Sequence, residues 1–519
     1  MKKRCPGPRA LETVAVDAMV ALGLVGSLVS LPAAAQTWRV QPAIDVQETY
    51  TTNANLAPTG QAEASFVTIL TPSIAFNASG PRAQLGGSAS VQAIAYSWNR
   101  DDNVLYPQVN LLGSVEALEK FFYIEGAVNV SQQYLSPFGA QPADNVGTTS
   151  NRYTSTGFRV SPYIRGVLPG RIAYVLRNDS IWSNLGNTPD TPGFVGSYVN
   201  NTFGRLDSPI VTFGWSAEVI ATYTTFTGEQ TLSNQLARAY LYYEPDPQLR
   251  LFGIGGYEKN DYFVTESSGP IYGGGAVWRP GPRTTIAGQW EERFFGPSYL
   301  ASFDHRNPGW AFNINASRNI STFPQLLFSV PAGGNVAGLV DAAFTTRIPD
   351  PVQRAAAVQE FLAQTGLPAT LQTPLNFYTQ QVVRYDQVSA TLAWIVGVRN
   401  SLALTAYYRE STVISGGSGV ALPPPFGAQN NNTQQGGSIA YSHRLTAFTS
   451  LTATATRFET VATAPFTDKS TTSFFQLAAV TRFSPKTDGT AGLTYTVFDS
   501  NAANDYTAFT AYVGLTYRF

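Results

Sequence analysis

Residues 506–519 have the sequence YTAFTAYVGLTYRF, and this stretch decides the fold class. Apolar and polar side chains alternate along it with a period of two, so they lie on opposite faces of a β-strand. One face is apolar and ends in two aromatic residues: Phe509, Ala511, Val513, Leu515, Tyr517 and Phe519. The other face is small or polar: Tyr506, Ala508, Thr510, Tyr512, Gly514, Thr516 and Arg518. The pattern is typical of a strand with lipid on one side and water on the other.

The spacing of four of these residues resembles the terminal signal that the bacterial outer-membrane insertion machinery reads. They are Tyr512, Gly514, Tyr517 and Phe519. The resemblance implies two partners, the lipid of the outer membrane and the β-barrel insertion machinery.

The N-terminus predicts secretion. Basic residues open the chain, an apolar run follows over 18–31, and small residues precede Gln36 in an A-x-A arrangement. We interpret 1–35 as a signal peptide cleaved after Ala35. A single membrane anchor is the alternative reading, but the run is shorter than the roughly 20 apolar residues that a spanning helix needs. The predicted barrel domain is therefore 36–519.

Composition agrees with a barrel in the outer membrane of a Gram-negative cell. Charged residues make up 13% of the chain, about half the share of a typical soluble domain. Aromatic residues also make up 13%, and such barrels carry aromatic rims around an apolar outer band. No apolar stretch after the signal approaches roughly 18 residues, so a closed barrel is the structure that can satisfy the backbone in lipid. The net charge of −1 indicates no nucleic-acid partner.

Turn signals divide the chain into alternating segments. Short turns such as 79–81 and 169–170 alternate with longer connections such as 134–151 and 411–432, which is the asymmetry of outer-membrane barrels. The count predicts an all-β, closed antiparallel transmembrane barrel of about 22 strands, within a range of roughly 18 to 24. An even number places both termini in the periplasm.

Alternation also assigns the faces of several strands. An outward charge at mid-bilayer costs roughly 2–4 kcal/mol, so polar sets are expected to face the lumen. Within 398–411, for example, Leu402 and Leu404 are predicted to face lipid. The predicted lumen-facing residues are Arg171, Arg177, Asp179, Arg399, Thr405, Tyr407, Arg409, Gln476, Arg482 and Arg518. Trp38, Trp182 and Trp394 are candidates for the interfacial girdles, with ordinary wall packing as the alternative.

The connection 320–378 is much longer than an ordinary loop and contains helical signals. Asp350 is a good N-cap, Pro351 suits the first helical position, and Gly366 suits the C-terminal cap. A second apolar stretch, 336–344, predicts another short helix. This helical insert either folds in and narrows the lumen or forms a compact cap on the rim.

The regions 293–322, 366–368 and 38–53 resemble a known family. They are similar to the outer-membrane β-barrel proteins associated with the PEP-CTERM/exosortase and exopolysaccharide systems of Gram-negative bacteria. The resemblance spans most of the mature chain. It implies an outer-membrane location and a place in polysaccharide or surface-protein export, with polysaccharide or export-system components as partners. It brings no transport substrate and no catalytic residues.

The sequence is poor in catalytic residues. Its only histidines, His305 and His443, both lie beside predicted short turns, and its single cysteine precedes the signal's apolar run. We therefore expect no enzyme activity, no metal site and no cofactor. The clusters 253–256 and 273–275 are rich in glycine but open no helix, so they predict bends or close packing rather than phosphate loops.

Two functions remain. The first is a porin-like channel that serves the export of exopolysaccharide or another surface polymer, or the passage of saccharides. A barrel of about 20 strands is wide enough for an aqueous lumen. The second is a non-conducting structural or assembly protein of the same system, whose lumen is filled by 320–378.

Overall fold

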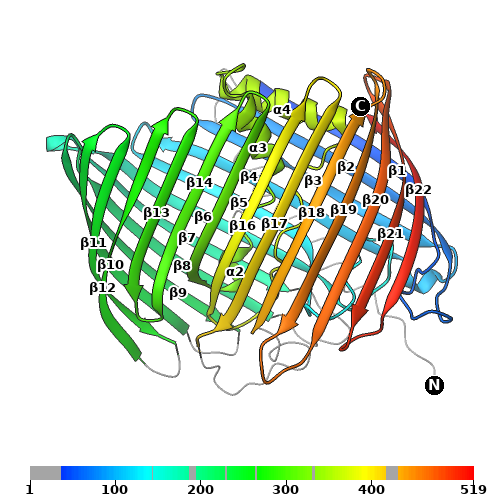
Figure 1. Cartoon of the computed structure of the whole chain (residues 1–519), viewed down its shortest axis with the longest axis horizontal. Coiled ribbons are helices and arrows are strands. Elements are labelled where there is room, and N and C mark those ends of the chain that lie inside the picture. The colour runs from blue at the N-terminus through cyan, green and yellow to red at the C-terminus, as the bar shows by residue number, and fades with distance from the viewer. Residues whose placement is uncertain are drawn as a thin grey trace.

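The structure, a computed structural model, describes residues 37–142, 144–185, 195–227, 231–262, 266–329, 333–415 and 431–519. They form one antiparallel sheet of 22 strands in which each strand pairs with its neighbours in the chain. Pairing of β1 (Thr37–Thr51) with β22 (Tyr506–Arg518) closes the sheet into a barrel (Figure 1). The predicted fold class and strand number are confirmed. The predicted signal peptide lies outside the described residues.

The first half of the barrel continues with β2 (Ser65–Ser79), β3 (Ala83–Tyr96), β4 (Val104–Leu118), β5 (Phe122–Tyr134), β6 (Arg152–Leu168), β7 (Ile172–Leu185), β8 (Val195–Asp207), β9 (Phe213–Phe226), β10 (Thr231–Asp246) and β11 (Leu249–Asp261). The second half comprises β12 (Glu266–Gly281), β13 (Thr284–Arg293), β14 (Gly296–Asn307), β15 (Trp310–Ser321), β16 (Val383–Val396), β17 (Asn400–Val413), β18 (Asn432–Arg444), β19 (Thr449–Ala462), β20 (Lys469–Ser484) and β21 (Thr487–Ser500). Short 3₁₀ turns are η1 (Arg100–Asp102) and η2 (Pro169–Arg171).

The two ends of the barrel differ in the length of their connections. We call one the turn end, because short turns such as 119–121 and 247–248 join the strands there. We call the other the loop end, because it carries long connections such as 135–151. One connection at the loop end is short, 294–295. Figure 1 shows the C-terminus at the turn end, which is uppermost in that view.

The outer face is apolar between two aromatic rims. On β22, Val513 and Leu515 are 60% and 49% exposed, while Thr510 on the opposite face is 5% exposed. Exposed tryptophans lie near both ends of the strands: Trp38, Trp215, Trp278 and Trp394 near the turn end, and Trp98, Trp182 and Trp290 near the loop end. These are the girdles expected where the barrel wall meets the two membrane interfaces.

The connection between β15 and β16 runs through the barrel rather than capping it. Its helices are α2 (Phe323–Leu326), α3 (Val336–Phe344) and α4 (Pro351–Thr365), so both predicted helices are confirmed. Figure 1 shows α2 towards the loop end and α4 at the turn end. The insert extends from 322 to 382, so it begins two residues later and ends four residues later than the predicted 320–378. None of the helices in the described parts of the chain is long and apolar enough to cross a membrane.

Local sequence explains why α4 begins and ends where it does. The side chain of Asp350 accepts a hydrogen bond of 2.8 Å from the backbone N–H of Gln353. Pro351 occupies the start, where its missing N–H costs nothing. Gly366 ends the helix with φ of 68°, a left-handed conformation that favours glycine.

Apolar side chains fix the insert to the inner face of the wall. Val336, Leu339 and Val340 of α3, Val358 of α4 and Leu367 are buried in one cluster. The wall side of this cluster consists of small residues, namely Ala311, Ala393, Ala403 and Ala440. Small side chains on the wall leave room for the larger ones of the insert. The helix α3 therefore lies against β14–β16 and α4 against β18–β19, while α2 lies against β7 and β8.

Candidate functional site in the barrel lumen

The wall that the helices α3 and α4 leave uncovered carries a network of buried ion pairs. Arg238 of β10 donates through Nη2 to Glu218 of β9 at 2.5 Å and through Nη1 to Glu291 of β13 at 2.9 Å. The side chains of Arg238, Glu218 and Glu291 are 13%, 7% and 4% exposed. Their strand neighbours Leu241 and Trp290 are exposed on the outer face, so the network faces the lumen.

Two glycines let Arg238 reach across the intervening strands. Gly256 of β11 is paired with Arg238, and Gly273 of β12 is paired with Glu291. A Cβ at Gly256 would lie 2.3 Å from the carbonyl oxygen of Ala237, and one at Gly273 would lie 2.1 Å from that of Trp290. No other residue fits there without a shift of the backbone, so the glycines permit a sharp bend of the wall. The sequence predicted bends at these clusters.

The network continues on both sides. Arg205 of β8 pairs with Asp207 at 2.9 Å and approaches Glu218 at 3.4 Å. Arg293 pairs with Glu258 at 2.8 Å, and both side chains are almost fully buried. Glu258 also accepts a hydrogen bond of 2.7 Å from the backbone N–H of Phe294. Because the carboxylates are paired and hydrogen-bonded, the wall bears many charges while leaving few of them free.

Aromatic rings lie beside the guanidinium groups. The centre of the Tyr240 ring is 5.7 Å from the guanidinium carbon of Arg205 and 5.8 Å from that of Arg238. Arg250 lies 5.8 Å from the ring of Tyr242 in the same way. The planar groups hold each other in place, so this part of the wall is rigid as well as polar.

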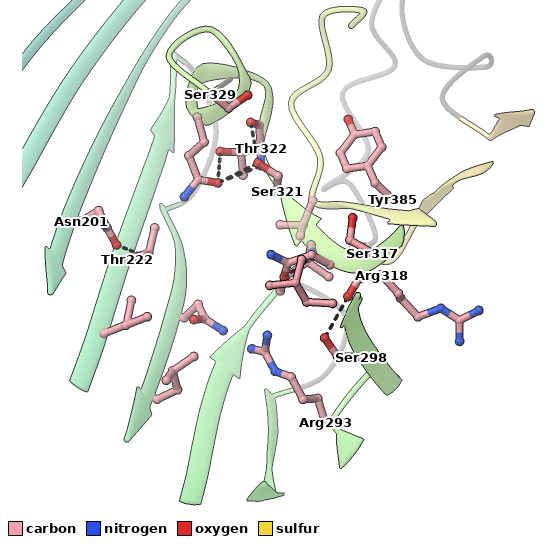
Figure 2. A pocket seen from close by; sticks show the side chains of 18 of the residues that line it. Asn201, Thr222, Arg293, Ser298, Ser317, Arg318, Ser321, Thr322, Ser329 and Tyr385 are labelled. Carbon is pink, nitrogen blue, oxygen red and sulfur yellow. Dashed lines mark hydrogen bonds between the residues drawn. The ribbon is translucent and has the colours of Figure 1, made fainter. Parts of the chain in front are cut away.

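A cavity of about 650 Å³ borders this network. Hydroxyl and amide side chains make up much of its lining, among them Asn201, Thr222, Gln289, Ser298, Ser317 and Gln325. Figure 2 shows Asn201 and Thr222 on one side and Arg293, Ser298 and Ser317 on the other. Residues of the insert next to α2, such as Ser329, contribute to the same cavity. The volume is in the range of small-molecule sites.

Polar contacts anchor the C-terminal end of α4 at the turn end. The free carbonyl of Gln364 accepts from the Ser450 hydroxyl at 2.5 Å, and that of Thr365 accepts from the Thr452 hydroxyl at 3.1 Å. Arg482 donates to Glu360 at 3.1 Å. Helix-end carbonyls have no partner inside the helix, and here the barrel wall supplies one. A hydrogen bond from Gln364 and the Arg482 guanidinium hold the pKa of the Glu360 carboxyl below its ordinary value.

A second connection folds inward, which the sequence did not predict. The loop 135–151 crosses the loop end, and the carbonyls of Pro137 and Phe138 accept hydrogen bonds from Ser470 and Ser500 at 2.8 and 3.0 Å. These partners are more than 300 residues away in the sequence. No local pattern indicates such a contact.

The predicted lumen-facing residues fall into three groups. Arg177 pairs with Asp179 and Glu125 at 2.7 Å each, Gln476 donates to the Tyr512 hydroxyl at 3.1 Å, and Arg518 pairs with Asp488. Thr405, Tyr407 and Arg409 face inward but are buried, and Arg482 contacts α4. Arg171 and Arg399 lie in turns at the turn end instead of on the strands. Turn residues are free of the strand's alternation, which is why the face assignment fails there.

Some polar residues lie on the outer face, against the expectation from alternation. Asn178 and Ser180 of β7 lie between the exposed Leu176 and Trp182. Asn178 donates to Asn200 and Thr202 of β8 at 3.1 and 2.9 Å. Their polar groups satisfy one another, which lowers the cost of placing them towards lipid.

The histidines take structural positions near the turn end. His305 contacts the hydroxyl of Thr284 at 2.8 Å, and His443 contacts the amide oxygen of Asn400 at 2.7 Å. Within the described ranges, no group of three or more His, Cys, Asp or Glu residues is placed to hold a metal ion.

Solved structures with a similar fold are outer-membrane proteins. The siderophore receptor PirA from Pseudomonas aeruginosa is 10% identical over 93% of this chain and 80% of its own, with a TM-score of 0.44. The outer membrane protein OpdK from the same organism is 9% identical over 93% and 99%, with a TM-score of 0.35. The FrpB iron transporter from Neisseria meningitidis is 7% identical over 92% and 82%, with a TM-score of 0.46. No protein-family model matches the sequence, and a search of curated proteins gave no match.

Proposed function

We propose that this outer-membrane β-barrel is a porin-like channel, narrowed by the insert 322–382, for polar solutes rich in hydroxyl groups. One observation carries the proposal. The helices α3 and α4 pack on β14–β16 and β18–β19, the ion-pair network lies on β8–β13, and the polar cavity lies between that network, the inner faces of β14–β17 and the start of the insert. A plug that merely filled the lumen would not need this buried, charged wall, because buried ion pairs add little to stability.

The chemistry of the uncovered wall suits saccharides. Neutral hydroxyls and amides of the cavity lining donate and accept hydrogen bonds. The arginines are held by carboxylates, so they add donors without a large excess of charge. In this proposal the turn end and both termini face the periplasm, and the protein has no enzyme activity. A role in the export of exopolysaccharide or another surface polymer rests on the family resemblance.

A non-conducting scaffold is the second candidate. It is supported by the course of the insert, which passes from the loop end to α4 at the turn end (Figure 1). Phe323 packs against Tyr153 and Leu185 of the wall at the loop end, and the Gln364 carbonyl accepts from Ser450 at the turn end. The inward loop 135–151 adds to the closure of the loop end.

Planar-bilayer recording separates the two. The refolded mature protein is compared with a variant in which 325–376 is replaced by a short Gly-Ser bridge. We expect single-channel conductance from both and a higher value for the deletion, because the main constriction is gone. A folded deletion whose conductance equals that of the intact protein would show that the insert is no constriction. Absence of conductance in both forms would favour the scaffold.

A further inference from the structure

Arg409 differs from the three arginines of the ion-pair network, Arg205, Arg238 and Arg293. Its side chain is 5% exposed. Arg205, Arg238 and Arg293 each pair with a carboxylate. Among the residues that the structure describes, no carboxylate forms an ion pair with Arg409. Burying a guanidinium without a counter-charge costs folding free energy. A residue that is kept in such a position is a candidate for binding an anionic ligand.

The insert supplies the partners that Arg409 has. Its Nη1 donates to the side-chain oxygen of Asn376 at 2.8 Å, and its Nη2 donates to the backbone carbonyl of Leu375. Its Nε is buried and has no hydrogen-bond partner. The ring of Tyr385 lies 5.1 Å from the guanidinium carbon. Two neutral oxygens therefore stand where a carboxylate would bind better, because a carboxylate binds a guanidinium with two charge-assisted hydrogen bonds.

Gln434 holds the same segment of the insert. Its side-chain oxygen accepts from the backbone N–H of Leu375 at 2.9 Å, and its amide donates to the carbonyl of Leu375 at 3.1 Å. Leu375 is thus fixed at both its N–H and its carbonyl. A ligand that replaces the Leu375 carbonyl as the acceptor of the Arg409 hydrogen bond therefore also disturbs the hydrogen bonds between Leu375 and Gln434.

Arg409 lines the polar cavity of about 650 Å³, together with Gln289, Ser298 and Ser317. We propose that Arg409 is a binding site for the carboxylate of an acidic sugar in this cavity, and that Leu375 and Asn376 of the insert occupy the site in the ligand's absence. The hydroxyl and amide lining takes the sugar hydroxyls, and the guanidinium takes the carboxylate. The inference rests on the proposed function, because it names the class of solute.

Binding has a mechanical consequence. The carboxylate replaces the carbonyl of Leu375 and the side-chain oxygen of Asn376 at Arg409, so the limb of the insert that returns to β16 loses its two hydrogen bonds with Arg409. An acidic solute then loosens the element that narrows the lumen.

Calorimetric titration of the full mature protein tests the site. Digalacturonate is the acidic probe, lactose the neutral disaccharide and acetate the carboxylate without a sugar. We expect digalacturonate to bind at least tenfold more tightly than either. Arg409→Gln should weaken its binding at least tenfold, because the amide keeps much of the shape but not the charge. Arg457→Gln, on the outer face of β19, is the matched control and should leave affinity unchanged. Equal binding of lactose, or equal affinity in Arg409→Gln, would overturn the proposal.

A measurement on the unmodified protein keeps the test decisive if Arg409→Gln does not assemble. Hydrogen exchange of the Leu375 amide should speed up at least tenfold when digalacturonate saturates the protein and should not change with lactose. Binding without faster exchange of this amide would exclude displacement of the insert. Neither the binding affinity nor the exchange rate depends on conductance. A protein that binds digalacturonate but does not conduct would therefore contradict the proposed channel function and leave the proposed Arg409 site intact.

Discussion

At the residue scale, the stability of the lumen wall depends on a few charged side chains whose partners come from strands that are not their neighbours. Arg238 and Glu291 are 53 residues apart in sequence, and the glycines between them in space bring them together. The side chain of Glu291 is 4% exposed and that of Arg238 is 13% exposed, so water reaches neither of them freely. Removal of Glu291 leaves Arg238 with Glu218 as its carboxylate partner and frees the Nη1 donor.

Glu291→Gln tests this dependence. We expect a loss of about 1.5–3 kcal/mol in the free energy of unfolding, because Arg238 loses its charge-assisted hydrogen bonds to Glu291 but keeps its ion pair with Glu218. Glu125→Gln is the matched control, since Glu125 pairs with Arg177 at 2.7 Å but both side chains are about a quarter exposed. Its loss should be about 0–1 kcal/mol. Urea titration of folding into vesicles measures both, and equal losses would contradict the network's role.

The face assignment gives a second prediction at this scale. Leu404→Arg puts a charge on the outer face near the middle of β17 and should cost about 2–4 kcal/mol. Thr405 faces the lumen, but an arginine there would not be tolerated. Thr405 is buried against Thr391, whose hydroxyl accepts from the insert's Gly334 N–H at 2.8 Å.

Asn110 is the better lumen-facing control, because it lies at a similar depth on β4 and is exposed. Asn110→Arg should change the free energy of unfolding by less than about 0.5 kcal/mol. Equal costs for Leu404→Arg and Asn110→Arg in the same folding titration would show that the two faces are wrongly assigned.

At the scale of elements, the insert combines local and non-local determinants. The cap at Asp350 and the stop at Gly366 are encoded within a few residues of the helix, so the sequence predicts α4 correctly. The position of α4 in the barrel is decided by hydrogen bonds from the hydroxyls of Ser442, Ser450 and Thr452 to the carbonyls at its C-terminal end. These residues belong to β18 and β19, 77 to 87 residues later in the sequence. The structure therefore puts α4 at the turn end, although the insert leaves the wall at the loop end.

Acid should loosen α4. The pKa of Glu360 is lowered in the folded protein by Gln364 and Arg482, so its contribution is present above the ordinary glutamate pKa of about 4.3 and is lost as pH falls through the lowered value. Hydrogen exchange of the α4 amides, corrected for the intrinsic rate, should therefore rise below about pH 4. Glu360→Gln should remove this pH dependence. The same rise in the variant would assign it to another group.

At the scale of the whole molecule, the difference between the two ends predicts the orientation in the membrane. Gln61 lies in a long connection at the loop end, and Gln248 lies in a short turn at the turn end; both are exposed. After signal cleavage the chain has no cysteine, so Gln61→Cys and Gln248→Cys each introduce one unique thiol. In intact cells a membrane-impermeant maleimide should label Gln61→Cys, and Gln248→Cys only after the outer membrane is opened. The opposite result would reverse the proposed orientation.

The alternation in 506–519 and the turn signals were enough to predict a closed barrel of about 22 strands, and the capping residues Asp350 and Gly366 with the apolar stretch 336–344 predicted the two helices of the insert. Those features follow from period-two geometry, capping and turn chemistry, which act between residues that are near in sequence. Only the tertiary structure decided the rest. The course of the insert through the lumen, the reach of Arg238 over Gly256 and Gly273, and the burial of Arg409 beneath Leu375 depend on closure of the barrel. Closure brings together residues whose sequence patterns carry no information about one another.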